Sequence, residues 1–150
     1  MKRLVLVLWV LSALFIYTDV AQAKSKEKEK AAIEALVDAY IRTINEGDLE
    51  LVGKIWSHDD CVTFTRSSGN FKGYEQIRDS VVLSFKNNFI KRDLKREELV
   101  IVVDGKSAWA EFVWKFDAVR NDGSKHTGQG RETQIFRKER GEWKLVHIHY

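Results

Sequence analysis

The chain has 150 residues, with 25 basic and 22 acidic side chains, a net charge of +3 and a single cysteine. Basic residues are interleaved with acidic ones and form no aromatic–basic motif, which excludes a dedicated nucleic-acid-binding face. The lone Cys61 excludes an internal disulfide.

The first residues have the three parts of a secretory signal peptide. Lys2 and Arg3 precede an almost wholly apolar run over residues 4–17, and Ala21-Gln22-Ala23 follows as a small-x-small cleavage pattern. We therefore predict a signal peptide over residues 1–23, a single exported domain over residues 24–150, in the periplasm or secreted, and no stable membrane association after cleavage. An uncleaved anchor is the alternative, although the apolar run falls short of the roughly 20 residues that a spanning helix needs.

Helices come first in the mature domain. An amphipathic stripe at helical spacing predicts a long first helix that ends before Gly47; its members are Ile33, Leu36, Val37, Tyr40, Ile41 and Ile44. Asp48 can cap a short second helix that ends near Trp56. Residues 74–85 predict a third helix, with Ile77, Val81 and Phe85 on its apolar side.

Strands fill the rest of the chain. A brief strand is predicted at residues 62–65, and four longer ones at 94–103, 107–120, 130–138 and 143–150, separated by glycine-containing turns. Consecutive strands behind helices predict an α+β fold, a curved antiparallel sheet with helices on one face.

The long strand should turn a wholly apolar face toward the helices; that face holds Ala108, Ala110, Phe112, Trp114, Phe116 and Ala118. On the last strand both faces carry large apolar groups. A sheet covered on one side only should have one wet face, so we predict a homodimer through the outer face with Val146, Ile148 and Tyr150. The alternative is an ordinary scatter of exposed apolar side chains.

Four segments in order resemble one family: residues 40–48 (YIRTINEGD), 71–77 (FKGYEQI), 131–133 (RET) and 141–149 (GEWKLVHIH). They are similar to the nuclear transport factor 2-like superfamily, in particular its SnoaL-like branch, and the ending is close to the association domain of calcium/calmodulin-dependent protein kinase. This resemblance implies a cone-shaped, curved antiparallel sheet wrapped around a long N-terminal helix, with two further helices, a pocket at the open end, and usually a dimer.

The chain also resembles ketosteroid isomerase, in which a first-helix tyrosine donates to the developing oxyanion. Tyr40 matches that tyrosine, whereas Thr65 stands at the position of the carboxylate base and Thr133 at that of the second, acidic donor. A threonine hydroxyl is far too weak a base to abstract a proton next to a carbonyl. We therefore expect a pocket without a carboxylate where deprotonation would occur, and no isomerase chemistry of that kind.

The association domain captures small carboxylates with arginines, and the matching positions here are Trp114 and Gln134. Arg131 lies nearby, on the face of Thr133. We predict a largely aromatic pocket for a flat or amphipathic small molecule, lined by Tyr40, Trp56, Phe64, Phe112, Trp114, Arg131, Thr133, His147 and His149. The alternative is that the aromatic side chains simply fill the cone.

His147 and His149 share one face of the last strand because they are two residues apart. Two imidazoles are too few for a tetrahedral metal site, so we expect no metal and no cofactor. With Tyr40, the two histidines are the candidate catalytic residues.

Three functions follow from these patterns. The first is an exported dimer that binds a small, largely apolar ligand without catalysis. The second is a SnoaL-like enzyme of the isomerase, cyclase or hydratase type that uses Tyr40 with a pocket histidine. The third is an assembly module like a kinase association domain.

Overall fold

The computed structural model describes residues 2–150, with side chains from residue 22 onward. Helix α1 (Lys2–Glu46) ends where the sequence predicts, because Gly47 adopts a left-handed φ of 68° and donates its N–H to the Thr43 carbonyl at 2.9 Å. The side chains of the predicted signal segment lie outside the described residues, apart from the last two. Within the part of the chain that was described, no helix is long and apolar enough to cross a membrane.

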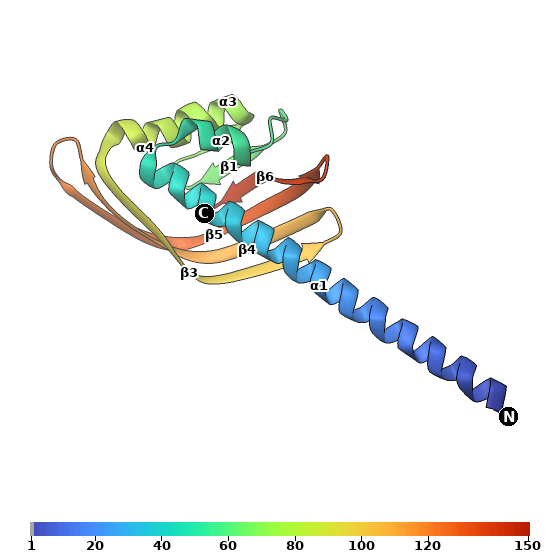
Figure 1. Cartoon of the computed structure of the whole chain (residues 1–150). Helices are drawn as coiled ribbons and strands as arrows, with labels where there is room; N and C mark the ends of the chain where they lie inside the picture. The colour runs from blue at the N-terminus through green and yellow to red at the C-terminus, as the bar shows by residue number, and fades with distance from the viewer. Residues whose placement is uncertain (1) are drawn as a thin grey trace.

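Four short helical elements follow α1 and its cap. Helix α2 (Leu49–Ile55) is capped by Asp48, whose carboxylate accepts a hydrogen bond from the Leu51 N–H at 2.9 Å. The predicted third helix is a succession of α3 (Tyr74–Ile77), the π-helical turn η1 (Arg78–Val82) and α4 (Leu83–Asn88). Figure 1 shows these elements above the sheet, while the N-terminal half of α1 extends away from it.

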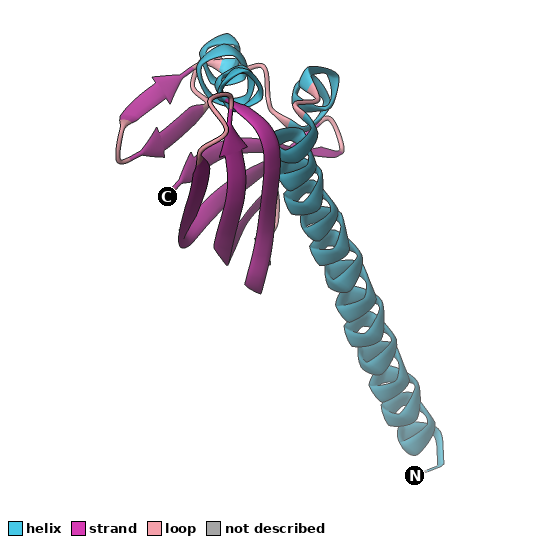
Figure 2. Ribbon diagram, turned by 90° about the vertical axis from the view of Figure 1, so that its left-hand side faces the viewer, coloured by secondary structure: helices cyan, strands magenta, loops and turns pink. Residues whose placement is uncertain are grey.

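Six strands form one curved sheet that α1 crosses on its concave side (Figure 2). The strands are β1 (Thr63–Arg66), β2 (Gly69–Lys72), β3 (Phe89–Asp104), β4 (Ser107–Arg120), β5 (Lys125–Glu139) and β6 (Glu142–His149), in the spatial order β2-β1-β6-β5-β4-β3. The α+β fold around a long helix is confirmed. The sheet is mixed rather than wholly antiparallel, because β1 pairs in parallel with β6.

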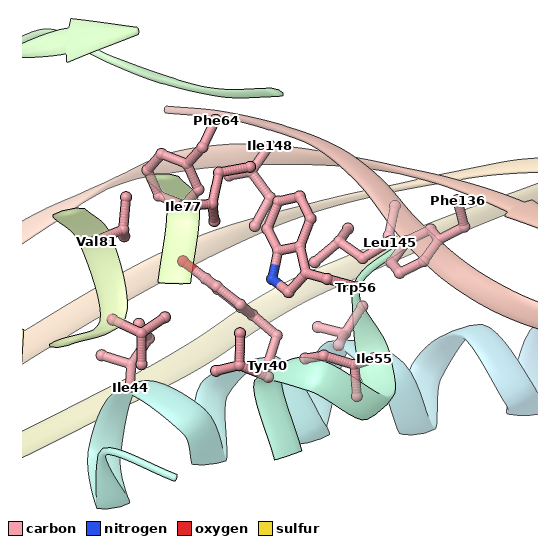
Figure 3. Close-up of a cluster of buried hydrophobic side chains, with 14 of the residues drawn as sticks. Tyr40, Ile44, Ile55, Trp56, Phe64, Ile77, Val81, Phe136, Leu145 and Ile148 are labelled. Carbon is pink, nitrogen blue, oxygen red and sulfur yellow. The ribbon is translucent and has the colours of Figure 1, made fainter. Parts of the chain in front are cut away.

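The core lies between α1 and the concave face of the sheet. Side chains from α1, α2, η1 and the inner faces of the strands meet there, among them Tyr40, Ile44, Trp56, Phe64, Phe112, Phe136, Leu145 and Ile148. Figure 3 shows the Tyr40 ring rising from α1 into this cluster, with its hydroxyl end directed away from the helix.

A β-bulge in β6 decides which of its side chains face the core. Ile135 pairs with His147, and the next residue, Phe136, pairs with Leu145, so Val146 is an extra residue in the strand. The bulge reverses the inward–outward alternation. Trp143 and Leu145 face the core before it, and Ile148 faces the core after it.

The predicted dimer surface is therefore wrong in its residues. Ile148 is completely buried in the core, and Val146 packs against the core from the bulge. Tyr150 lines an internal cavity instead of an outer face. The two apparently apolar faces of the last strand are one inward face, interrupted by the bulge.

Candidate functional site

A cavity of about 570 Å³ opens between the concave face of the sheet, α1 and α4. Its apolar wall consists of Ile44, Phe85, Phe89, Leu94 and Phe116. The exposed side chains of Ser67, Ser68, Asn88 and Arg120 mark the open side. Six larger side chains bring polar atoms to the cavity: Tyr40, Arg66, Trp114, His126, Glu132 and Tyr150. A space of this size and character suits a small amphipathic molecule.

Glu132 is the carboxyl group of this cavity. It lies on β5 opposite Phe112 and keeps only 3% of its surface exposed. The Gln134 amide donates a hydrogen bond to Glu132 Oε1 at 2.7 Å. Burial raises the pKa of Glu132 to about 8, although the hydrogen bond from Gln134 opposes that rise. The expectation of a pocket without a carboxylate is therefore wrong.

Two tyrosines share this environment with Glu132. Burial raises the pKa of Tyr40 well above its ordinary value, and the nearby Glu132 charge raises it further. Burial also raises the pKa of Tyr150, against the opposing influence of Arg66. Both phenols stay protonated near neutral pH, so each can donate a hydrogen bond to an oxygen atom in the cavity.

Two nitrogen donors on the cavity wall have no hydrogen-bond partner within the described chain: Arg66 Nε and Trp114 Nε1, both buried. The Trp114 ring lies flat on β5, where an added Cβ at Gly130 would come within 2.8 Å of Cζ2. The absence of a side chain at Gly130 thus leaves the space that the Trp114 indole occupies in the cavity wall. Buried N–H groups normally have a hydrogen-bond acceptor, so a bound ligand could supply the acceptor at each of these two positions.

The structure divides the predicted pocket residues into three groups. Tyr40 and Trp114 line the cavity. Trp56, Phe64 and Phe112 are fully buried in the core cluster and are not among the residues that line the cavity.

The remaining four lie on the other side of the sheet, which corrects their predicted position. Arg131 is exposed and donates to Glu111 at 3.0 Å, and Thr133 shares that outward parity. His147 Nδ1 lies 2.7 Å from Thr63 Oγ1, and His149 is exposed. Burial, together with the His149 charge, lowers the pKa of His147. Neither histidine can act on a molecule in the cavity.

Sequence reasoning missed Glu132, Arg66 and Tyr150. Glu132 could have been found from the register of the β4–β5 hairpin. Pairing of the two strands from the turn at residues 121–123 places Glu132 opposite Phe112, which the sequence had already assigned to the interior face. Tyr150 was misplaced by the bulge in β6. No sequence pattern pointed to Arg66, since it is the last residue of the brief strand β1, whose neighbours in the sheet the sequence does not reveal.

Among the described residues, no three His, Cys, Asp or Glu side chains gather into a group that could hold a metal ion. The polar groups of the cavity include several hydrogen-bond donors and a single carboxyl group among the described residues. They suit an organic molecule that carries oxygen atoms.

Comparison with known proteins agrees with this architecture. The family model described as a SnoaL-like domain matches residues 33–150. A nuclear transport factor 2-like superfamily protein from Salmonella enterica subsp. enterica serovar Typhimurium str. LT2 is 30% identical, with a TM-score of 0.76 and coverage of 86% of this chain and 91% of that one.

The association domain of CaMKII from C. elegans shares the fold at 20% identity and a TM-score of 0.67, with coverage of 83% and 96% of the two chains. An NTF2-like protein of unknown function from Pseudomonas putida KT2440 shares it at 16% identity and a TM-score of 0.70, with coverage of 82% and 85%. No curated protein matches. The chain belongs to the SnoaL-like domain family, within the nuclear transport factor 2-like superfamily.

Proposed function

We propose that this SnoaL-like domain is an enzyme that binds a small amphipathic carbonyl compound in its cavity and transfers a proton through Glu132. The observation that carries the proposal is the buried Glu132 carboxyl group, whose pKa is raised to about 8 beside the Tyr40 phenol. A catalytic acid or base works best when its pKa lies close to the working pH. Glu132 meets that condition near neutrality.

The chemistry follows from the protonation states. With a pKa of about 8 for Glu132, roughly one molecule in ten carries the carboxylate at pH 7. That form accepts a proton from the carbon next to a carbonyl group, and the electron pair moves to the carbonyl oxygen as an enolate. Tyr40 donates a hydrogen bond to this oxygen in a setting of low dielectric, where such a bond is strong. Return of the proton to the same or another carbon completes an exchange or an isomerisation.

The test uses 2-tetralone, a bicyclic ketone with acidic hydrogens next to its carbonyl. In D₂O at pH 7, mass spectrometry follows deuterium uptake with wild type, Glu132→Gln and Tyr40→Phe. We expect acceleration over buffer by the wild type, none by Glu132→Gln, and a rate reduced by about 10²-fold for Tyr40→Phe. A ¹³C NMR titration of the glutamate side chains measures the Glu132 pKa independently, and a value near 4.5 would contradict the proposal.

A second candidate is capture of the same kind of molecule without turnover. One observation favours it: within the described residues, Glu132 is the single carboxyl side chain on the cavity wall, and it accepts a hydrogen bond from Gln134. Thr65 does not supply a second polar group, because its hydroxyl donates to Asn70 at 3.0 Å. Binding of 2-tetralone with no exchange above buffer would favour this candidate.

We further propose that the domain pairs with a second copy through the convex face of the sheet. Val102, Trp109 and Ile135 are cross-strand neighbours there and stay 39%, 40% and 40% exposed. Contiguous exposed apolar groups are typical of a protein–protein interface. Export also remains a proposal: mass spectrometry of the protein from its own source would show whether residues 1–23 are removed.

A further inference from the structure

Arg66 places a positive charge on the cavity wall without a counter-ion. Its side chain is half-buried at the end of β1, and its Nε is buried with no hydrogen-bond partner in the described chain. By contrast, Arg78, Arg96 and Arg137 each pair with a carboxylate within 3.0 Å. Among the described residues, no carboxylate lies at ion-pair distance from Arg66. A partly buried guanidinium normally has such a partner, since desolvation is otherwise uncompensated.

The fold holds Arg66 in this position. The guanidinium carbon lies 5.0 Å from the centroid of the Phe71 ring on the neighbouring strand β2. The Tyr150 N–H donates to the Thr65 carbonyl at 3.2 Å, which places Tyr150 beside Arg66. If the guanidinium moved into solvent, it would lose its contact with the Phe71 ring. This contact therefore favours the position in which Arg66 Nε lies at the cavity wall without a partner.

A second unpartnered donor lies close to Tyr150. The Trp114 ring is 5.5 Å from the Tyr150 ring, and its buried Nε1 has no partner in the described chain. Arg66 and Trp114 are thus both neighbours of Tyr150: the Arg66 side chain interacts with the Tyr150 phenol, while Arg66 Nε and Trp114 Nε1 each keep an N–H without a partner. An oxyanion accepts several such bonds at once, and bonds of this kind to a charged acceptor are shorter and stronger than neutral ones.

The charges around the cavity also favour an anionic ligand group. Arg120 adds a second cation at the open side, where Nη2 lies 2.9 Å from His126 Nδ1. The one carboxyl side chain on the described wall, Glu132, is mostly uncharged near neutrality because burial raises its pKa to about 8. The cavity thus carries net positive charge around an aromatic body.

We propose that Arg66 and Trp114 form a subsite for the anionic group of the ligand, which is a small amphipathic carboxylate or comparable monoanion with an aromatic or alicyclic body. The body packs on Phe85, Phe89 and Phe116. This inference rests on the proposed function, in that the cavity binds a small molecule. The arginine comes from β1, and not from positions 114 and 134, where the association-domain resemblance would have placed it.

The test compares two probes that share one body. 8-Anilinonaphthalene-1-sulfonate carries an anionic group, and N-phenyl-1-naphthylamine lacks it. Isothermal titration at pH 7 measures both with wild type, Arg66→Met and the control Arg42→Met, which removes an exposed arginine outside the cavity. We expect the wild type and the control to prefer the sulfonate by about tenfold or more. The affinity of Arg66→Met for the sulfonate should fall by about that factor, and its affinity for the neutral probe should fall less than twofold.

The outcomes separate the two proposals. Equal affinity of the wild type for both probes overturns the subsite but leaves the cavity as a binding site. Failure of the wild type to bind either probe contradicts the proposed function itself. If thermal melting shows that Arg66→Met does not fold, Trp114→Phe decides, because it removes the Nε1 donor and keeps an aromatic ring. Unchanged preference for the sulfonate in that variant overturns the subsite.

Discussion

Replacing Glu132 with glutamine should change how the stability of the protein depends on pH. The carboxyl group is buried with a pKa of about 8, whereas its ordinary value is 4.5. Below pH 4.5 the group is protonated in both the folded and unfolded states. Between these two values the unfolded chain releases the proton and the folded protein keeps it, so stability falls as the pH rises. Glutamine has nearly the same shape and never ionises.

The magnitude follows from the two pKa values. One pKa unit corresponds to about 1.4 kcal/mol, so the interval from 4.5 to about 8 represents a loss on the order of 5 kcal/mol in the free energy of unfolding, complete near pH 8. No screening by solvent reduces this figure much, because the residue is only 3% exposed. A loss of that size is comparable to the whole stability of many single domains.

The assay is urea unfolding at several pH values from 4 to 9, followed by circular dichroism. The quantity of interest is the difference in unfolding free energy between Glu132→Gln and wild type, since the titration of other groups cancels in it. We expect the unfolding free energy of Glu132→Gln to rise relative to that of the wild type from about pH 5 to pH 8. The variant should be the more stable protein at pH 8. The control Glu142→Gln, which removes an exposed carboxylate on β6, should show no such trend. A constant difference between Glu132→Gln and wild type across the range would refute the reasoning.

Four further substitutions test the packing and the outer face. Gly130→Ala should destabilise the protein by about 1–3 kcal/mol and shift the tryptophan emission, because its Cβ would lie 2.8 Å from Trp114 Cζ2; Gly128→Ala, at 3.3 Å, should cost less in the same urea titration. Trp109→Glu should convert a dimer to monomer in sedimentation without loss of helical signal, and an unchanged dimer would remove the convex face as the interface. Ile148→Asp should instead unfold the domain, since it places a charge in the core, and a folded variant would contradict the inward orientation of that residue.

The sequence predicts most of the architecture because local patterns determine it. The apolar stripe through Ile33 and Ile44 requires a helix, and Gly47 ends it at a left-handed position. The turns at residues 104–105, 121–123 and 140–141 set the three hairpins, and the strand at residues 107–120 has the same bounds in the structure. Elements of this kind depend on neighbours in sequence.

The site depends on features that local patterns do not contain. The bulge at Val146 shifts every later side chain of β6 to the opposite face, which moves His147 and His149 out of the cavity and Tyr150 into it. A one-residue irregularity has no distinctive composition, but it reverses the alternation on which the prediction rested. The parallel pairing of β1 with β6 joins segments about 80 residues apart, and it brings Arg66 to the cavity.

The order of strands has a consequence for when the domain can fold. β6 comes last in the described sequence yet lies inside the sheet, between β1 and β5. Until the ribosome has released β6, the β1–β2 hairpin has no sheet to join, and the cavity lacks one of its walls. Contacts between distant segments also close slowly. The sheet and its cavity are therefore completed late in folding, when β6 inserts between β1 and β5.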